Sequence, residues 1–463
     1  MKYAHLAWPF FEPTHREFAS ELDRWVSVHL AEFEQDEGNN GRAARKIFEL
    51  LARSGWLKQT LPAPAAPHDP AKIDLRSVCL LREISAYSSA IADVALSEPW
   101  LGILPIALYG SPALREFYLS KYLSGDLLPA FALSEPDAGS DAGAIATSAH
   151  LDGDHYVING RKTWTSNSGL ADLYVVFARM VGRGDDGGIS AFAIDGNAEG
   201  LLLEQRVEVS SPHTVGTWTL NNCRIPPDRL IGEPGQGLKI ATSVLELFRP
   251  TVGAAALGLA RRAMAEAISR STRRTAFGKP ISEHQLVQAK LADMAVRVDA
   301  AALLVYRAAW QHDTSDVSIA REAAIAKLYS TEAAFEVIDQ AVQIFGGHCS
   351  MSIAAALILR LGGEQQRITL GAAGVGGAGR LGLGDVLGED RDHADAAAVR
   401  GDHDLVGLVL GHAELRLQDG DDKFAGREVV VDEDDLVQAR PFGLGFNLGL
   451  RLGDGIDHSG GAS

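Results

Sequence analysis

The stretch that most constrains how this chain folds runs from Phe131 to Gly169, with the sequence FALSEPDAGSDAGAIATSAHLDGDHYVINGRKTWTSNSG. It opens with an apolar run that breaks at Pro136 into a glycine- and serine-containing turn, Ala138-Gly139-Ser140-Asp141. Glycine lets backbone N–H groups come close to an anion, and serine adds a hydroxyl donor. The turn therefore predicts a place where a phosphate group binds.

Two dipeptides typical of tight turns follow, Asp152-Gly153 and Asn159-Gly160, on either side of Tyr156-Val157-Ile158. They predict that the segment folds back on itself as short antiparallel strands. That fold would bring Trp164 and Ser166 close to the glycine- and serine-containing turn. The whole stretch is therefore typical of a β-module that binds a ligand.

These residues resemble the flavin-binding segment of the acyl-CoA dehydrogenase family, which has the form (Y/F)-x-(L/V)-(S/T)-E-P-x-A-G-S-D followed by N-G-x-K-x-W-(I/T)-(S/T)-N. The resemblance implies that the first part wraps the ring and pyrophosphate of FAD. The tryptophan would cover a ring face, and the hydroxyl two residues later would hydrogen-bond flavin N5. These roles fall on Phe131, Leu133, Ser134, Gly139, Ser140, Trp164 and Ser166. The alternative is an ordinary β-hairpin with a structural tryptophan, because motif matches are hypotheses.

Charge and cysteine content exclude several classes of protein. The formal net charge of −17 argues against a nucleic acid partner, because binding a phosphate backbone needs clustered Lys and Arg. Cys79, Cys223 and Cys349 form no CxxC pair, so we expect neither a disulfide framework nor a metal site, and each cysteine should be a buried or half-buried thiol. The N-terminus has no signal-peptide pattern, and no apolar run is long enough to cross a membrane, so we expect a cytoplasmic protein.

The first part of the chain, residues 1–128, has the pattern of an α-helical domain. Thr14 and Glu17 fit a capping box, in which the two side chains satisfy free backbone donors at the start of a helix. Ser111-Pro112 fits an N-cap followed by proline at the first helical position.

Residues 129–237 have the pattern of a β-domain, with β-prone runs at 172–179, 189–194 and 217–220. In residues 238–360, long helical segments, which we place at 237–273, 283–311 and 317–344, suit an antiparallel bundle. This order resembles the α+β architecture of the acyl-CoA dehydrogenases: an N-terminal α-helical domain, a middle β-domain and a C-terminal four-helix bundle.

Two later clusters resemble the remaining FAD contacts of the family. They comprise Arg274, Phe277, Gln285, Gln343, Gly346 and Gly347. The resemblance implies that these residues complete an FAD site shared across a homodimer, usually within a homotetramer.

The reaction implied by the resemblance is α,β-dehydrogenation of an acyl-CoA, in which a carboxylate removes the α-proton and a hydride passes to flavin N5. The family's usual partner is an electron-transferring flavoprotein. The two positions where relatives carry the catalytic glutamate hold Leu370 and Phe248 here. Glu246 and Glu364 are the candidate substitutes, and Ser140 and Arg249 are expected to bind the substrate.

The tail at residues 361–463 departs from the family. It holds 22 of the 48 glycines and no Trp or Tyr, and it lacks steady hydrophobic periodicity. Our hypothesis is that it is the product of a shifted or read-through reading frame. Its GxGxxG at 374–379 lacks the strand and helix that a nicotinamide site needs. Its acidic and histidine residues have no regular metal-binding spacing.

Two rival interpretations remain open. The first is a homologue that binds flavin or acyl-CoA without catalysing dehydrogenation, because the usual base is missing. The second is a flavin-dependent oxidase or monooxygenase on the same fold.

Overall fold

The structure is a computed structural model that describes residues 3–30, 40–62, 72–182, 185–207, 209 and 213–347. All of these residues belong to the first of the two compact units into which the chain divides, Met1–Arg380. The predictions made for Cys349, Glu364 and the tail at 361–463 lie outside the described residues.

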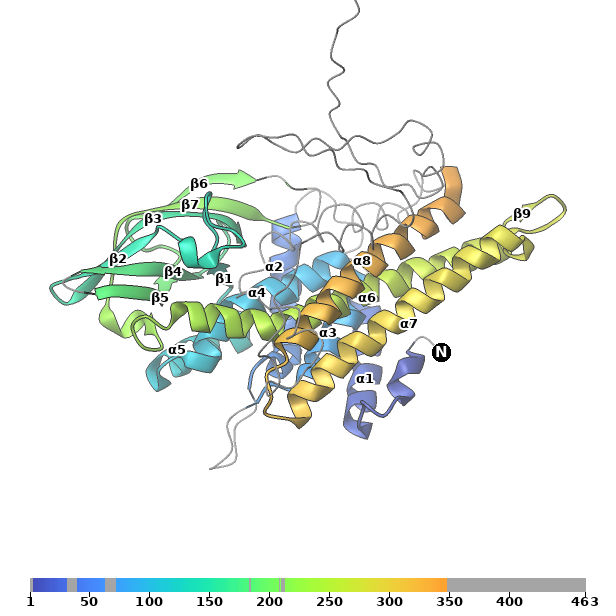
Figure 1. Ribbon diagram of the computed structural model, residues 1–463, viewed down its shortest axis with the longest axis horizontal. Coiled ribbons are helices and arrows are strands. Elements are labelled where there is room, and N and C mark those ends of the chain that lie inside the picture. Colours follow the sequence, from blue (N-terminus) through green and yellow to red (C-terminus); the bar gives the residue numbers. More distant parts are fainter. Residues whose placement is uncertain are drawn as a thin grey trace, which may run out of the picture. The chain divides into compact units, whose positions relative to one another are not determined.

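The first part of the chain is helical, as the sequence predicts. Its elements are η1 (Ala4–Ala7), α1 (Pro13–His29), α2 (Asn40–Arg53), η3 (Trp56–Thr60), α3 (Leu75–Ser88), α4 (Ala90–Tyr109) and α5 (Pro112–Ser124) (Figure 1). The predicted start of α5 is confirmed, because the N–H of Leu114 donates to Ser111 Oγ at 3.2 Å and Pro112 is the first helical residue.

The predicted cap of α1 is wrong. The helix begins at Pro13, and its capping pair is Glu12 and His15 rather than Thr14 and Glu17. The Glu12 N–H donates to His15 Nδ1 at 3.1 Å. Proline fits the first helical position because its φ is already helical and it has no N–H to satisfy. Thr14 therefore lies inside the helix.

The middle of the chain forms an eight-stranded sheet. Its strands are β1 (Pro129–Ala132), β2 (Ser148–Asp152), β3 (His155–Ser166), β4 (Leu173–Gly182), β5 (Asp185–Asp195), β6 (Leu201–Val207), β7 (Val215–Ile225) and β8 (Leu230–Ile231). The order is β6-β7-β3-β2-β4-β5-β8, and β1 pairs in parallel with β4. The three β-prone runs of the sequence lie in β4, β5 and β7.

One of the two predicted turns is wrong. β2 and β3 form the expected hairpin, with Asp152 opposite His155. The dipeptide Asn159-Gly160, however, lies inside β3, where the pairing with β7 is irregular. A Cβ on Gly160 would lie 2.4 Å from Thr147 Oγ1, and Gly160 has a φ of 156°. The glycine therefore serves a bulge that lets a neighbouring segment approach, not a chain reversal.

The last described part consists of long helices that pack against one another (Figure 1). They are α6 (Gly237–Arg273), α7 (Gln285–Thr314) and α8 (Ala320–Phe345), and between α6 and α7 lie the short strands β9 (Thr275–Ala276) and β10 (Lys279–Pro280) and the turn η6 (Ile281–Glu283). These helices match the predicted segments. α6 also packs on α3 and α4 of the first part, so both helical parts share one core.

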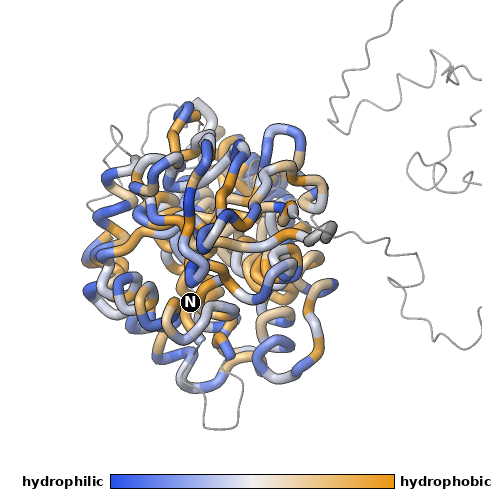
Figure 2. Tube along the Cα trace, turned by 90° about the vertical axis from the view of Figure 1, so that its left-hand side faces the viewer, coloured by the Kyte–Doolittle hydropathy of each residue, from blue (hydrophilic) through white to orange (hydrophobic). Residues whose placement is uncertain are grey.

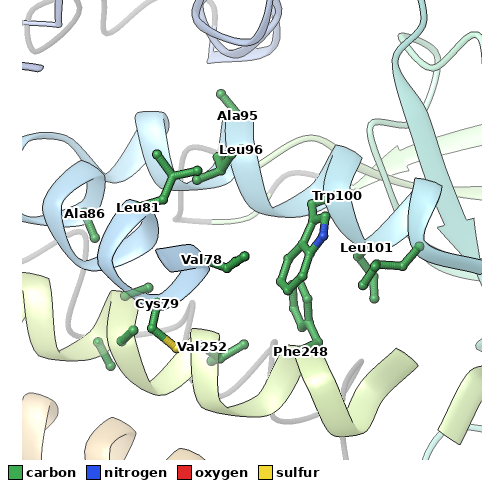
Figure 3. Close-up of a cluster of buried hydrophobic side chains, with 14 of the residues drawn as sticks. Val78, Cys79, Leu81, Ala86, Ala95, Leu96, Trp100, Leu101, Phe248 and Val252 are labelled. Atoms are coloured by element: carbon green, nitrogen blue, oxygen red, sulfur yellow. The ribbon is translucent and has the colours of Figure 1, made fainter. Parts of the chain in front are cut away.

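Figure 3 shows where α3, α4 and α6 meet. Trp100 of α4 is fully buried; its ring centroid lies 5.6 Å from that of Phe248 on α6, and its Nε1 donates to Thr60 O at 2.6 Å. Cys79 is a buried free thiol of this cluster, and Cys223 is one in the sheet, so the expectation for these two cysteines is confirmed.

The apolar character of α4 and α6 is explained by this core. By length and composition alone both helices are able to cross a membrane, but 78% and 72% of their apolar windows are buried inside the fold. Along other helices in Figure 2, hydrophobic and hydrophilic residues alternate, which is typical of helices that bury only one face.

A buried charge cluster ties the N-terminal segment to this core. Glu83 of α3 lies 2.8 Å from Arg261 Nε on α6 and 3.3 Å from His5 Nε2, and it accepts a hydrogen bond from Tyr306 on α7. Burial raises the pKa of Glu83, but His5, Arg261 and the hydrogen bonds outweigh burial and lower that pKa to about 2. Glu83 is therefore a buried carboxylate that stays ionised and holds segments from distant parts of the sequence together.

α3 and α6 approach so closely at Gly258 that a side chain does not fit. A Cβ on Gly258 would lie 2.2 Å from the carbonyl oxygen of Glu83 and 3.0 Å from the backbone nitrogen of Tyr87. Because both of these atoms are backbone, no rotation of a side chain relieves the clash.

A buried ion pair fixes the turn that follows β1. Lys162 Nζ on β3 donates to Glu135 Oε1 at 2.7 Å and to Leu133 O at 2.9 Å. The backbone N–H groups of Ala146 and Thr147 also donate to the Glu135 carboxylate, at 2.6 and 3.0 Å. Burial raises the pKa of Glu135, but Lys162 and these donors outweigh it and lower that pKa. Burial lowers the pKa of Lys162 to about 8, against the opposing effect of Glu135.

We expect Gly258→Ala to destabilise the protein, because the backbones of α3 and α6 must move apart to admit the methyl group. Overpacking of this kind costs about 1–3 kcal/mol of unfolding free energy. Thermal and denaturant unfolding measure the loss. Gly182→Ala is the control, since a Cβ there meets nothing within 4 Å and its φ is not positive. Equal stability of the two variants would contradict the close approach.

We expect Lys162→Met to destabilise the protein by about 3–5 kcal/mol, because it leaves the Glu135 carboxylate buried without its partner. The neighbouring Arg161 pairs with Glu204 on the surface at 2.8 Å, so Arg161→Met should cost no more than about 1 kcal/mol. Denaturant unfolding of both variants makes the comparison. Similar losses for the two would show that the Glu135–Lys162 pair contributes no more than an exposed one.

Candidate functional site

The turn between β1 and β2 has backbone donors at its outer edge that no described residue accepts. Glu135 and Ala138 bond to each other through both backbone pairs, at 2.9 and 3.2 Å. Gly139 and Ser140 follow and are exposed. Among the described residues, none accepts the backbone hydrogens of Gly139 or Ser140, and none bonds the Ser140 hydroxyl. The turn thus presents the unpaired donors that the sequence predicts for an anionic ligand.

The residues just before Gly139 and Ser140 are held in place by packing and by a backbone hydrogen bond. Phe131 is half-buried on β1, and its ring centroid lies 4.9 Å from that of Phe177. Leu133 and Ser134 are buried, and the carbonyl oxygen of Ser134 accepts from the N–H of Thr163 at 2.9 Å. This last bond joins the turn directly to β3.

Trp164 follows that junction in a strained conformation. Its φ is 56°, which is uncommon for a residue with a large side chain, and the pairing of β3 with β7 slips between Lys162 and Thr165. The indole is 45% exposed, although Trp164 lies within a central strand. Strain of this kind concentrates at binding sites. β3 therefore presents an aromatic face one residue after the bond from Thr163 that joins it to the turn.

Ser166 lies two residues further along β3 and has a partner that sequence reasoning missed. Its Oγ lies 2.9 Å from His213 Nε2, and Glu98 Oε1 of α4 lies 3.9 Å from the same nitrogen. A signal for Glu98 exists in the sequence, since it is one of two charged residues in the apolar stretch 90–109. No sequence signal distinguishes His213, because it lies in a loop and its approach depends on the sheet.

A second group of predicted residues gathers where α6 and α8 end. A Cβ on Gly346 would lie 3.5 Å from Arg274 Nη1, so the guanidinium reaches the turn after α8. Gly346 has φ 61° and ψ −143°, a conformation that is essentially restricted to glycine. Gln343 and Gly347 are exposed beside it.

The hairpin of β9 and β10 carries the remaining predicted residues. Phe277 and Gly278 form its two-residue turn, both with positive φ, and Phe277 is 96% exposed. Gln285 begins α7 and is exposed.

Glu246, one of the two candidate bases, forms two hydrogen bonds within the fold. Its Oε1 accepts from Ser318 Oγ at 2.8 Å and from the N–H of Ile319 at 2.7 Å. These contacts satisfy free donors at the start of α8. The same carboxylate also offsets the desolvation of Arg249 nearby. The carboxylate of Glu246 is thus already used to hold the start of α8, which argues against Glu246 as the catalytic base.

Two cations, Arg249 and Lys327, lie close together, and their side chains form no hydrogen bond or ion pair within the described part of the chain. Burial lowers the pKa of Arg249 on α6, and burial together with Arg249 lowers the pKa of Lys327 on α8 to about 8. Lys327 is 7% exposed. Sequence reasoning found Arg249 but missed Lys327, which lies in an alanine-rich helix. Two poorly solvated positive charges near one another favour the binding of an anionic group.

The three parts of the chain match models of known domains. They are the acyl-CoA dehydrogenase N-terminal domain at residues 12–126, the middle domain at 130–223 and the C-terminal domain at 235–358. A protein of Mycobacterium tuberculosis named probable acyl-CoA dehydrogenase FadE25 is 38% identical over 336 residues, which cover 72% of this chain and 85% of that protein.

Solved structures agree in fold. Butyryl-CoA dehydrogenase from Megasphaera elsdenii has a TM-score of 0.69 at 29% identity and covers 79% of this chain and 96% of its own. An acyl-CoA dehydrogenase complexed with FAD from Bacillus anthracis has a TM-score of 0.69 at 26% identity and covers 79% of this chain and 65% of its own. These findings confirm the resemblance and the fold class read from the sequence: the chain belongs to the acyl-CoA dehydrogenase family.

Proposed function

We propose that this chain is an FAD-dependent acyl-CoA dehydrogenase that introduces a double bond between the α and β carbons of an acyl-CoA. When bound, FAD supplies the hydride acceptor, N5 of the isoalloxazine ring. The protein's own residues must hold that ring against the acyl chain, exclude water and remove the α-proton.

The residues of the sheet fit FAD. The observation that carries the proposal is the exposed indole of Trp164, held at positive φ one residue after the bond that joins Thr163 to the turn. That turn carries Gly139 and Ser140, whose donors have no acceptor among the described residues. A large aromatic face next to unpaired N–H groups suits a ligand with a flat ring and a pyrophosphate. The Ser166 hydroxyl lies two residues from the indole, where it would meet the edge of a ring stacked there.

The second group fits a role in a neighbouring subunit. A phenylalanine that is 96% exposed at a hairpin tip buries almost no surface in its own chain. Under this proposal Phe277, Arg274 and the turn at Gly346 complete the FAD site of a second copy, in a homodimer or homotetramer. The planar guanidinium of Arg274 suits a pyrophosphate because it can donate two parallel hydrogen bonds.

The unpaired cations suit the substrate. Arg249 and Lys327 offer positive charge in a poorly solvated place, where an anionic or strongly polarised group of an acyl-CoA would be held more firmly than in water. Ser140 is proposed to contact the substrate as well. The proposed electron acceptor is an electron-transferring flavoprotein.

A second candidate function is a homologue that binds FAD and acyl-CoA without dehydrogenating the substrate. The observation that favours it is the engagement of Glu246 with the start of α8. Glu364, the other candidate base, lies outside the described residues.

Anaerobic addition of acyl-CoA separates the two candidates. We expect the purified protein to be yellow and its flavin absorbance to bleach when acyl-CoA thioesters of increasing chain length are added, because hydride transfer reduces the flavin. A yellow protein that bleaches with none of them supports the non-catalytic candidate. A colourless protein that takes up no added FAD contradicts both.

The same assay tests Glu246. We expect Glu246→Gln to bleach at a rate similar to wild type, because the amide oxygen still accepts from Ser318 and Ile319 and keeps the start of α8 intact. A loss of about a hundredfold or more in bleaching rate, with FAD retained, would instead assign the base to Glu246.

We expect Arg274→Lys to weaken FAD retention about tenfold, because an ammonium cannot reproduce the paired donors of a guanidinium. Equilibrium binding of FAD to the apoprotein measures the change. Arg273→Lys is a matched control, since its exposed neighbouring guanidinium bonds only within α6, to Ser269 O at 3.0 Å. Unchanged FAD affinity in Arg274→Lys would remove Arg274 from the site.

A further inference from the structure

Three polar side chains from distant parts of the sequence meet at Ser166. His213 lies between β6 and β7, and Glu98 lies on α4. His213 Nε2 is 2.9 Å from Ser166 Oγ and 3.9 Å from Glu98 Oε1. The side chains of His213 and Glu98 are only 12% and 13% exposed, so water weakens their interaction little.

Glu98 lies on a helix that is mostly apolar. α4 has two charged residues, and the other, Asp93, forms hydrogen bonds of 2.8 and 2.7 Å with Arg82. Half-burying a carboxylate costs free energy unless an opposite charge or a donor lies near it. The group near Glu98 is the imidazole of His213, so the packing of α4 against the sheet brings a carboxylate to the nitrogen that faces Ser166.

The position of Glu98 favours one direction for the hydrogen bond between His213 and Ser166. An ionised carboxylate only accepts, so a hydrogen on His213 Nε2 is favoured by Glu98, and a lone pair there would be repelled. With its hydrogen on Nε2, the imidazole donates to Ser166 Oγ. The serine's own hydrogen then remains available. Among the described residues, no other side chain bonds to Ser166 Oγ.

We propose that His213, held by Glu98, is a positioning residue that directs the hydroxyl hydrogen of Ser166 to the isoalloxazine ring of FAD. The inference rests on the proposed function, which puts that ring beside Trp164 and Ser166. A hydrogen bond donated to the ring stabilises the electron density that reduction adds, so it raises the reduction potential of the bound flavin. His213 and Glu98 thereby tune the flavin without touching it.

The test is a double-mutant cycle read by the reduction potential, which is measured against reference dyes and requires no substrate. We expect Ser166→Ala and His213→Leu each to shift the potential to more negative values. The double variant should shift no further than Ser166→Ala, because His213 acts only through that hydroxyl. His213→Gln keeps an N–H donor and should restore most of the wild-type potential.

Glu98→Gln should shift the potential in the same direction by a smaller amount, since the tautomer of His213 loses its electrostatic bias. If His213→Leu does not hold FAD, Glu98→Gln decides alone: a negative shift supports the inference and a wild-type potential overturns it. His155→Leu is the control, because His155 lies at the far end of β3 beside the exposed Asp154.

Two results would overturn the inference while leaving the proposed function standing. The first is a yellow His213→Leu variant with the wild-type potential. The second is a double variant whose shift equals the sum of the two single shifts. A wild-type protein that binds no FAD is a different outcome, because it overturns the proposed function and the inference together.

Discussion

The Glu135–Lys162 ion pair is the interaction on which the rest of the site depends. It joins a turn from the start of the sheet to a central strand, and the main-chain bond between Ser134 and Thr163 lies beside it. These two connections hold the edge of the turn that carries Gly139 and Ser140. Trp164 follows on β3, where the pairing with β7 slips. One buried charge pair thus ties together the strand that carries the exposed ring and the turn that carries the donors.

Much of this was predictable from the sequence because it is local. The cap at Ser111, the hairpin at Gly153 and the long helices depend on neighbouring residues, and the structure confirms them. The errors at Thr14 and Asn159-Gly160 have a different origin. A second cap, Glu12, was available two residues earlier. At Gly160 the close approach of Thr147 turned a turn signal into a bulge. Local propensity does not contain such tertiary contacts.

The same distinction applies to the site. The motif residues on the sheet are contiguous in sequence, so a pattern finds them. Glu98, His213 and Lys327 come from three separate elements, and only packing gives them their neighbours. Glu246 is the opposite case. Its position in the sequence makes it a candidate base, but in the structure its carboxylate binds the start of α8.

The shared helical core has a consequence for how the chain is made. Glu83 and Gly258 pack together although the whole β-domain separates them in the sequence. Tyr306, which lies still later in the sequence, donates a hydrogen bond to Glu83. During synthesis the first helices must therefore wait, with their apolar faces uncovered, until the ribosome has produced the third part of the protein. Contacts of such long sequence separation fold slowly, and the waiting intermediate is open to aggregation. The N-terminal helices should therefore depend on chaperones. The β-domain can fold early, because its strands pair only with one another.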